Sequence, residues 1–164
     1  MVISKTIQAA VNDQINAELY SSYLYRAMAA YFDSLNLPGF AAWMKVQAKE
    51  EEAHAQRFNA FIVERGGRVI LKAIAEPPAA WKSPLDAFSA AYTHEQHITD
   101  RINKLVALAD KQADPATTVM LAWFVNEQVE EENNARTIVE QLKMIKDSAG
   151  ALFMLDHQLG KRGK

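Results

Sequence analysis

Long stretches without glycine or proline constrain the fold of this chain more than any other feature of its sequence. The few glycines and prolines gather at short breaks that divide the chain into segments. Within each long segment apolar residues recur every three or four positions, and no useful length shows the period of two that strands require. We therefore expect an all-α protein whose helices cover approximately residues 4–33, 38–65, 84–111, 115–145 and 150–158.

The connections between these helices indicate how they are arranged. Short turns near residues 34–37 and 112–114 should fold the first and second helices, and the third and fourth, into antiparallel hairpins. The link from Gly66 to Ser83 can span about 60 Å, which exceeds the roughly 40 Å length of the neighbouring helices. These lengths predict a single domain over residues 1–164, a four-helix bundle with one long crossover connection and a short fifth helix at its carboxyl end.

Composition excludes several classes of function. The formal net charge of -2 provides no basic surface for nucleic acid. The absence of cysteine excludes disulfides, thiolate metal sites and a cysteine nucleophile, so any metal ligands must be nitrogen or oxygen atoms. There is no apolar run of about 18 residues and no signal-peptide pattern. We expect a cytoplasmic protein that does not interact with a membrane.

Each apolar stripe of the four long helices carries polar residues near its middle. The core-facing polar residues are Glu18, Glu51, His54, Glu95, Gln128 and Glu131. An ionised carboxylate inside a bundle costs several kcal/mol unless it is paired or binds a metal. Because lysine and arginine are missing from these core positions, a dication surrounded by the carboxylates is their simplest partner.

The spacing of these residues predicts that they lie at one depth in the bundle. Glu18 and His54 are each 18 residues from the turn near position 36, and Glu95 and Glu131 are each 18 residues from position 113. Glu51 and His54 are neighbours on their helix and can bind one ion, as the Glu-x-x-His motif does in di-iron carboxylate bundles. His54 alone could equally be a core histidine with its hydrogen bonds satisfied, but the matched carboxylates favour a metal site.

Other residues near this level allow two interpretations. Glu127 and Glu130 flank the core stripe of the fourth helix and could hold another cation together with Glu50, or form a solvated acidic edge. Tyr25 follows Glu18 by two turns on the same stripe. It could have a redox or hydrogen-bonding role, or simply pack in the core.

Taken together, these motifs make the chain resemble the bacterial non-haem ferritins. The resemblance rests on "NAELYSSYLY", "EEAHAQRF", "HEQHIT" and "FVNEQVEEE", one in each long helix, and it extends over essentially the whole chain. It implies a ferritin-like fold and a homo-oligomeric hollow shell of twenty-four subunits. It also implies iron storage with ferroxidase activity, in which Fe(II) is oxidised by O2 or H2O2 and kept inside as ferric mineral.

The resemblance further implies roles for individual residues. Glu18, Glu51 and His54 match one iron site of a ferroxidase centre. Glu51, Glu95 and Glu131 match a second iron site, so Glu51 is expected to bridge the two ions.

Additional residues match more peripheral parts of the same centre. Gln128 lies alongside the second iron site, and Tyr25 matches a tyrosine near the centre. Glu50, Glu127 and Glu130 match a third iron site, which shares Glu131 with the second.

The bacterioferritins also resemble this chain, but it departs from them at two places. Glu52 stands where bacterioferritins carry a haem-ligating methionine, so we expect iron without haem. Gln128 and Glu131 replace their second Glu-x-x-His motif, and a neutral amide offsets less metal charge than a carboxylate. This asymmetry predicts one tighter and one looser iron site.

Two other functions are compatible with buried carboxylates. One is a di-iron oxygenase or peroxidase acting on an organic substrate, which would require an apolar pocket beside the metals. The other is a structural scaffold or interaction module in which the carboxyl groups are protonated or hydrated.

Overall fold

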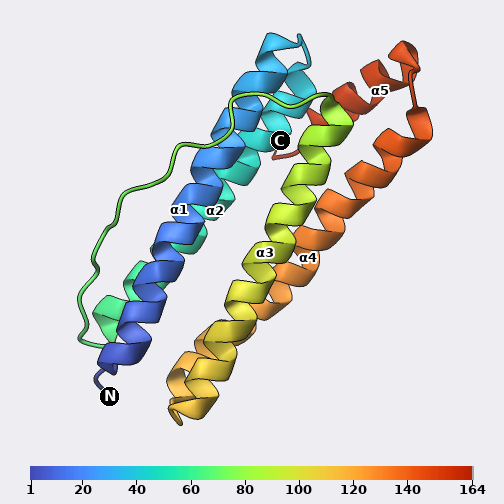
Figure 1. Cartoon of the computed structure of the whole chain (residues 1–164). Helices are drawn as coiled ribbons and strands as arrows, with labels where there is room; N and C mark the ends of the chain where they lie inside the picture. Colours follow the sequence, from blue (N-terminus) through green and yellow to red (C-terminus); the bar gives the residue numbers. More distant parts are fainter. Residues whose placement is uncertain (164) are drawn as a thin grey trace.

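The computed structural model describes residues 1–163, which fold into five α-helices and contain no strand. The helices are α1 (Lys5–Ser34), α2 (Pro38–Glu64), α3 (Pro84–Lys111), α4 (Pro115–Ile145) and α5 (Ala149–Leu159). Each helix ends within one residue of the predicted bounds. Figure 1 shows that α1 to α4 form a bundle of two hairpins, with α5 lying near one end. The predicted all-α bundle with a long crossover and a fifth helix is confirmed.

Local sequence explains where several helices begin. Ser4, Ser83 and Asp114 precede α1, α3 and α4, and the side chain of each accepts a hydrogen bond from the backbone N–H three residues ahead. Such bonds satisfy donors that the first helical turn leaves free. Pro84 and Pro115 follow two of these caps, where a missing N–H costs nothing.

The crossover between α2 and α3 runs along the outside of α1 (Figure 1). Its backbone is attached to α1 by amide side chains. Asn12 accepts a hydrogen bond from the backbone N–H of Ile70 at 2.8 Å and donates one to the carbonyl oxygen of Arg68 at 3.1 Å. Gln8 accepts another from the N–H of Arg68 at 2.9 Å. These contacts hold a segment without regular secondary structure against the bundle.

The apolar core is divided into two clusters by the polar residues at the middle of each helix. Near α5, the rings of Phe32 and Phe40 stack with centroids 5.0 Å apart. Toward the other end, Phe58 and Phe124 stack with centroids 4.0 Å apart. Burial of these clusters supplies most of the driving force for folding. It also holds the intervening polar layer away from water.

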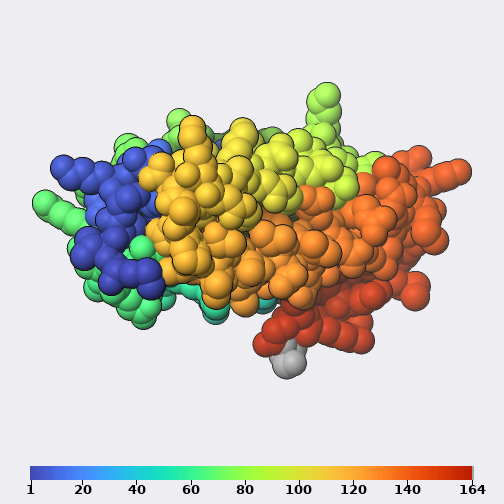
Figure 2. All heavy atoms as spheres, turned by 90° about the horizontal axis from the view of Figure 1, so that it is seen from below, coloured from blue at the N-terminus to red at the C-terminus, as the bar shows by residue number. Residues whose placement is uncertain are grey.

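Helix α5 packs on the start of α2 through a very close backbone approach. A Cβ atom at Gly39 would collide with the backbone carbonyl oxygen of Asp156, so only glycine fits at this position. The Asp156 side chain also accepts a hydrogen bond from the backbone N–H of Phe40 at 2.9 Å. Figure 2 shows the α5 end of the chain projecting from one side of the bundle. None of the helices in residues 1–163 combines the length and the apolar character needed to span a bilayer.

Candidate metal centre

The structure gathers the core-facing carboxylates and one histidine into two overlapping groups. One ligand atom from each of Glu18, Glu51 and His54 lies within 4.8 Å of the others, and the same holds for Glu51, Glu95 and Glu131. All five side chains are buried, with exposed fractions between 1% and 4%. Glu51 belongs to both groups, which is the position that a ligand shared by two ions must have.

The histidine lies at the meeting point of three acidic side chains. His54 Nδ1 is 3.1 Å from Glu51 Oε2 and 4.0 Å from Glu18 Oε2. Its other ring nitrogen, Nε2, is 3.8 Å from Glu127 Oε1. The ring also packs edge-on against Trp123, with the centroids 5.5 Å apart, which fixes its plane. A fixed imidazole beside carboxylates is a suitable ligand for a first-row dication.

Two buried glutamines donate hydrogen bonds to these carboxylates. Gln14 Nε2 donates to Glu18 Oε1 at 2.7 Å, and Gln47 Nε2 donates to Glu51 Oε1 at 2.9 Å and to Glu131 Oε2 at 2.7 Å. The sequence patterns above do not single out Gln14. The spacing could have indicated its role, because Gln14 precedes Glu18 by four residues, just as Gln47 precedes Glu51. Both amides orient carboxylates without adding charge.

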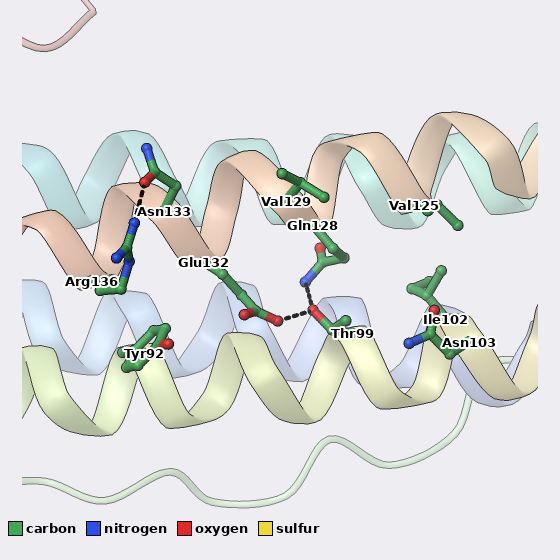
Figure 3. A pocket seen from close by; sticks show the side chains of 10 residues that line it. All are labelled: Tyr92, Thr99, Ile102, Asn103, Val125, Gln128, Val129, Glu132, Asn133 and Arg136. Atoms are coloured by element: carbon green, nitrogen blue, oxygen red, sulfur yellow. Dashed lines mark hydrogen bonds between the residues drawn. The ribbon is translucent and has the colours of Figure 1, made fainter.

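Glu95 receives its donors from two other helices. The hydroxyl of Tyr25 on α1 donates to Glu95 Oε1, and Gln128 Nε2 on α4 donates to Glu95 Oε2 at 3.2 Å. Figure 3 shows the Gln128 amide nitrogen directed toward Thr99, whose hydroxyl donates to Glu132 at 2.6 Å. Gln128 therefore connects the buried centre with a surface groove between α3 and α4.

Burial raises the pKa of every carboxyl group in the two ligand groups. The pKa of Glu18 rises to about 8 through burial and then the negative charge of Glu51. The pKa of Glu131 also rises to about 8, through burial and then Glu95, whereas burial brings the pKa of Glu95 to about 7. Burial and the neighbouring charges of Glu95 and Glu131 hold the pKa of Glu51 well above its usual range. A dication would replace the protons that these groups otherwise retain.

Two buried oxygen atoms in this layer lack a hydrogen-bond partner among residues 1–163. They are Glu18 Oε2 and Gln47 Oε1. Buried acceptors without partners are costly and uncommon in folded proteins. A cation bound between the carboxylates would satisfy acceptors of this kind, so the donor set fits a metal ion with a preference for oxygen and nitrogen.

The residues of the expected third iron site lie at the edge of this layer, but they are less closely grouped. Glu127 forms a group with His54 and Glu131. Glu50 is half-buried and forms an ion pair with Arg162, while Glu130 is exposed. Within residues 1–163, neither Glu50 nor Glu130 is part of such a ligand group. Their joint binding of an ion stays a prediction.

Glu52 lies outside the metal centre, as helical geometry predicts for the third glutamate of its run. It is half-exposed and pairs with Arg26 at 3.2 Å. Adjacent glutamates on α2 therefore have separate environments. Glu50 is at the edge of the polar layer, Glu51 is inside it, and Glu52 faces away.

The sequence and the fold are similar to those of characterised ferritins. The sequence model of the Ferritin family, described as a ferritin-like domain, matches residues 8–145. A bacterial non-heme ferritin from Bacteroides fragilis (strain 638R) is 41% identical over 98% of this chain and 100% of its own length. One from Staphylococcus aureus (strain USA300) is 37% identical over 98% and 97%.

Solved structures show the same likeness. A structure described as a novel open pore ferritin from the hyperthermophilic archaeon Archaeoglobus fulgidus superposes with a TM-score of 0.97 and 51% identity, covering 98% of this chain and 99% of that one. An engineered closed form of the Archaeoglobus fulgidus ferritin also gives a TM-score of 0.97, with 52% identity over 98% of both chains.

Proposed function

This chain belongs to the ferritin family, and we propose that it is an iron storage protein that oxidises Fe(II) at its buried carboxylate centre and retains the ferric product. The observation that carries this proposal is the pair of ligand groups that share Glu51. Two ions held by such groups are close enough to deliver electrons to one oxidant. Residues 1–164 act together as a single domain in this proposal.

Two iron ions would occupy the two groups as substrate. Glu18, Glu51 and His54 hold one ion, and Glu51, Glu95 and Glu131 hold the other. Each Fe(II) loses one electron, and the pair of electrons reduces O2 with two protons to H2O2, or H2O2 with two protons to two water molecules. Hard carboxylate oxygens favour the ferric state that results.

The residues around the second ion suit a site that iron passes through. Gln128 provides a neutral amide that donates to Glu95, where a carboxylate would add a negative charge. Tyr25 donates to the same carboxylate and is proposed to orient it. The second ion is therefore held less tightly than it would be with a carboxylate at position 128, and it can move on. The third iron site, with Glu50, Glu127 and Glu130, is the proposed next position.

We further propose assembly into a shell of twenty-four subunits in the cytoplasm, whose reducing conditions maintain Fe(II). Large apolar side chains on the described surface support assembly, since Phe153, Met154 and Leu71 are each at least 70% exposed. Light scattering tests the number of subunits. Twenty-four chains of 18.4 kDa would give a mass of about 440 kDa, as expected for a closed symmetric shell.

The combined substitution Glu51→Ala and His54→Ala tests the centre directly. Stopped-flow absorbance should show the rapid formation of ferric iron in the natural protein and none in the double variant. Glu64→Ala, on an exposed position of the same helix, is the matched control and should oxidise iron normally. Both variants should assemble to the same mass. Undiminished rapid oxidation in the double variant would rule out this centre.

Iron loading separates storage from the other proposed functions. A storage shell should take up several hundred or more iron ions per assembly and retain them after gel filtration. A di-iron oxygenase or peroxidase would retain about two per subunit. If Fe(II) neither binds nor raises the melting temperature, the structural scaffold is the correct alternative, because a ligand that binds only the folded state must stabilise it.

A further inference from the structure

The chain after α5 returns to α2 and places an arginine beside the metal centre. Arg162 Nη2 donates to Glu50 Oε2 at 2.5 Å. The same guanidinium lies over the ring of Trp43, 4.2 Å from its centroid. The Arg162 side chain is only 20% exposed. A cation–π contact and a charge-assisted hydrogen bond therefore position a permanent positive charge at this point.

Glu50, the partner of this arginine, stands at the edge of the metal layer. It immediately precedes Glu51, the carboxylate shared by both ligand groups. Burial raises its pKa above the ordinary value, the positive charge of Arg162 opposes that shift, and the carboxylates of Glu127 and Glu130 add to it. Glu50 is thus within electrostatic reach of the buried centre and of the acidic residues that face it from α4.

We propose that Arg162 is a tethered cation that competes with iron for Glu50, and that it thereby controls the third iron position and the passage of iron away from the two-iron centre. This inference rests on the proposed function. The short hydrogen bond from Arg162 draws electron density from Glu50 Oε2 and places the guanidinium in front of it. An ion that binds this carboxylate must therefore compete with the hydrogen bond and overcome the repulsion of the positive charge.

The contact is built so that the arginine can leave. Its other terminal nitrogen, Nη1, has no hydrogen-bond partner among residues 1–163, so one hydrogen bond and one ring contact hold the guanidinium. Its backbone lies beyond α5, where residues 160–163 form no further helix. A multivalent ion entering the acidic edge brings more positive charge than the guanidinium that it replaces. Because Arg162 hydrogen-bonds to Glu50 and, within residues 1–163, to none of the ligands of the two-iron centre, it is a positioning residue that acts through Glu50.

Anaerobic calorimetric titration of the assembled protein with Fe(II) tests this inference. Zn(II), a redox-inert dication that also binds nitrogen and oxygen ligands, serves as a second probe. Arg162→Ala should bind the third ion per subunit about two- to fivefold more tightly, the range expected for removal of a partly exposed ion pair. Rapid oxidation of the first two irons per subunit should be unchanged. Arg162→Lys should restore most of the natural affinity, because it keeps the charge.

A double-variant cycle shows whether Arg162 acts through Glu50. In a Glu50→Ala background, Arg162→Ala should leave the affinity for the third ion unchanged, since the contested carboxylate is gone. Lys161→Ala removes the neighbouring exposed positive charge and is the matched control. Light scattering confirms that every variant remains assembled, which excludes a loss of α5 packing as the cause.

Three results would overturn the inference. One is an affinity for the third ion that is unchanged in Arg162→Ala. Another is an increase in that affinity in Lys161→Ala as large as in Arg162→Ala, which would reveal only a general effect of surface charge. The third is an effect of Arg162→Ala that persists without Glu50. In each case rapid oxidation of two irons per subunit would leave the proposed function intact. Absence of rapid oxidation in the natural protein would overturn both.

Discussion

Glu18→Gln should make the metal-free protein more stable at pH 8 while weakening its binding of iron. Glu18 is buried, accepts one hydrogen bond from Gln14, and leaves its second oxygen without a partner among residues 1–163. A glutamine has nearly the same shape and no charge. The substitution therefore removes the cost of burying a carboxylate and keeps the packing of the bundle.

The pKa of Glu18 determines the sign and the size of this effect. Its ordinary value is 4.5, and burial followed by the charge of Glu51 raises it to about 8 in the folded protein. Between these values the folded state binds more protons than the unfolded state, so stability falls as the pH rises. At 1.36 kcal/mol per unit of pKa, the loss between pH 5 and pH 8 is of the order of 3 kcal/mol. The Glu18→Gln variant does not lose this stability, because a glutamine side chain does not ionise.

Thermal and denaturant unfolding of chelator-treated protein at both pH values would measure the difference. The gain from Glu18→Gln should be of the order of 3 kcal/mol larger at pH 8 than at pH 5. Glu64→Gln, on the exposed surface of α2, should change little at either pH. All samples need one protein concentration, because assembly contributes to stability. Added Fe(II) or Zn(II) should stabilise the natural protein more than the variant. An equal gain at both pH values, or a loss at pH 8, would refute the reasoning.

Three other predictions concern contacts described above. Gly39→Ala should lower the melting temperature in calorimetry by an amount equivalent to about 1–3 kcal/mol, because its methyl group must displace α5; a neutral result would contradict that packing. Tyr25→Phe removes the hydroxyl donor to Glu95 and should slow ferric formation in stopped-flow measurements. The melting temperature of the iron-loaded protein should change by no more than a few degrees, because one hydrogen bond is worth about 1 kcal/mol. Asp114→Asn should cost about 1 kcal/mol at pH 7. Arg65 lowers the pKa of Asp114, so urea titrations should show this difference disappearing as the pH falls below the ordinary carboxyl range and persisting at higher pH.

The helices could be predicted closely because their ends are encoded locally. Ser83 with Pro84, and Asp114 with Pro115, specify helix starts through contacts within a few residues. The two-hairpin arrangement follows from the lengths of the connections, since a short turn permits only an adjacent antiparallel helix. The location of α5 depends on the close approach at Gly39, a contact between distant parts of the chain that no local pattern encodes.

The candidate metal centre could be recognised because buried charge interrupts an apolar stripe. Glu51 and His54 stand out at helical spacing, and the structure groups them with the other carboxylates as that spacing predicts. As iron ligands these residues stay a prediction, which the Glu51 and His54 variants test. Gln14 is less visible, since a buried glutamine becomes informative only when its partner is known. Arg162 is invisible to pattern analysis, because its partner Glu50 lies 112 residues earlier in the chain.

The polar layer between the two apolar clusters also bears on how long an empty subunit survives. Local opening is easiest where few apolar contacts must break. In the metal-free bundle we therefore expect it at the level of Glu18 and Glu51, between the two apolar clusters. An ion bound there would join the two hairpins at their weakest level. Proteases act on opened chains, so loaded subunits should resist degradation longer than empty ones. Bound iron would then determine how long the protein persists, and depletion of iron would lead to faster degradation of the metal-free protein.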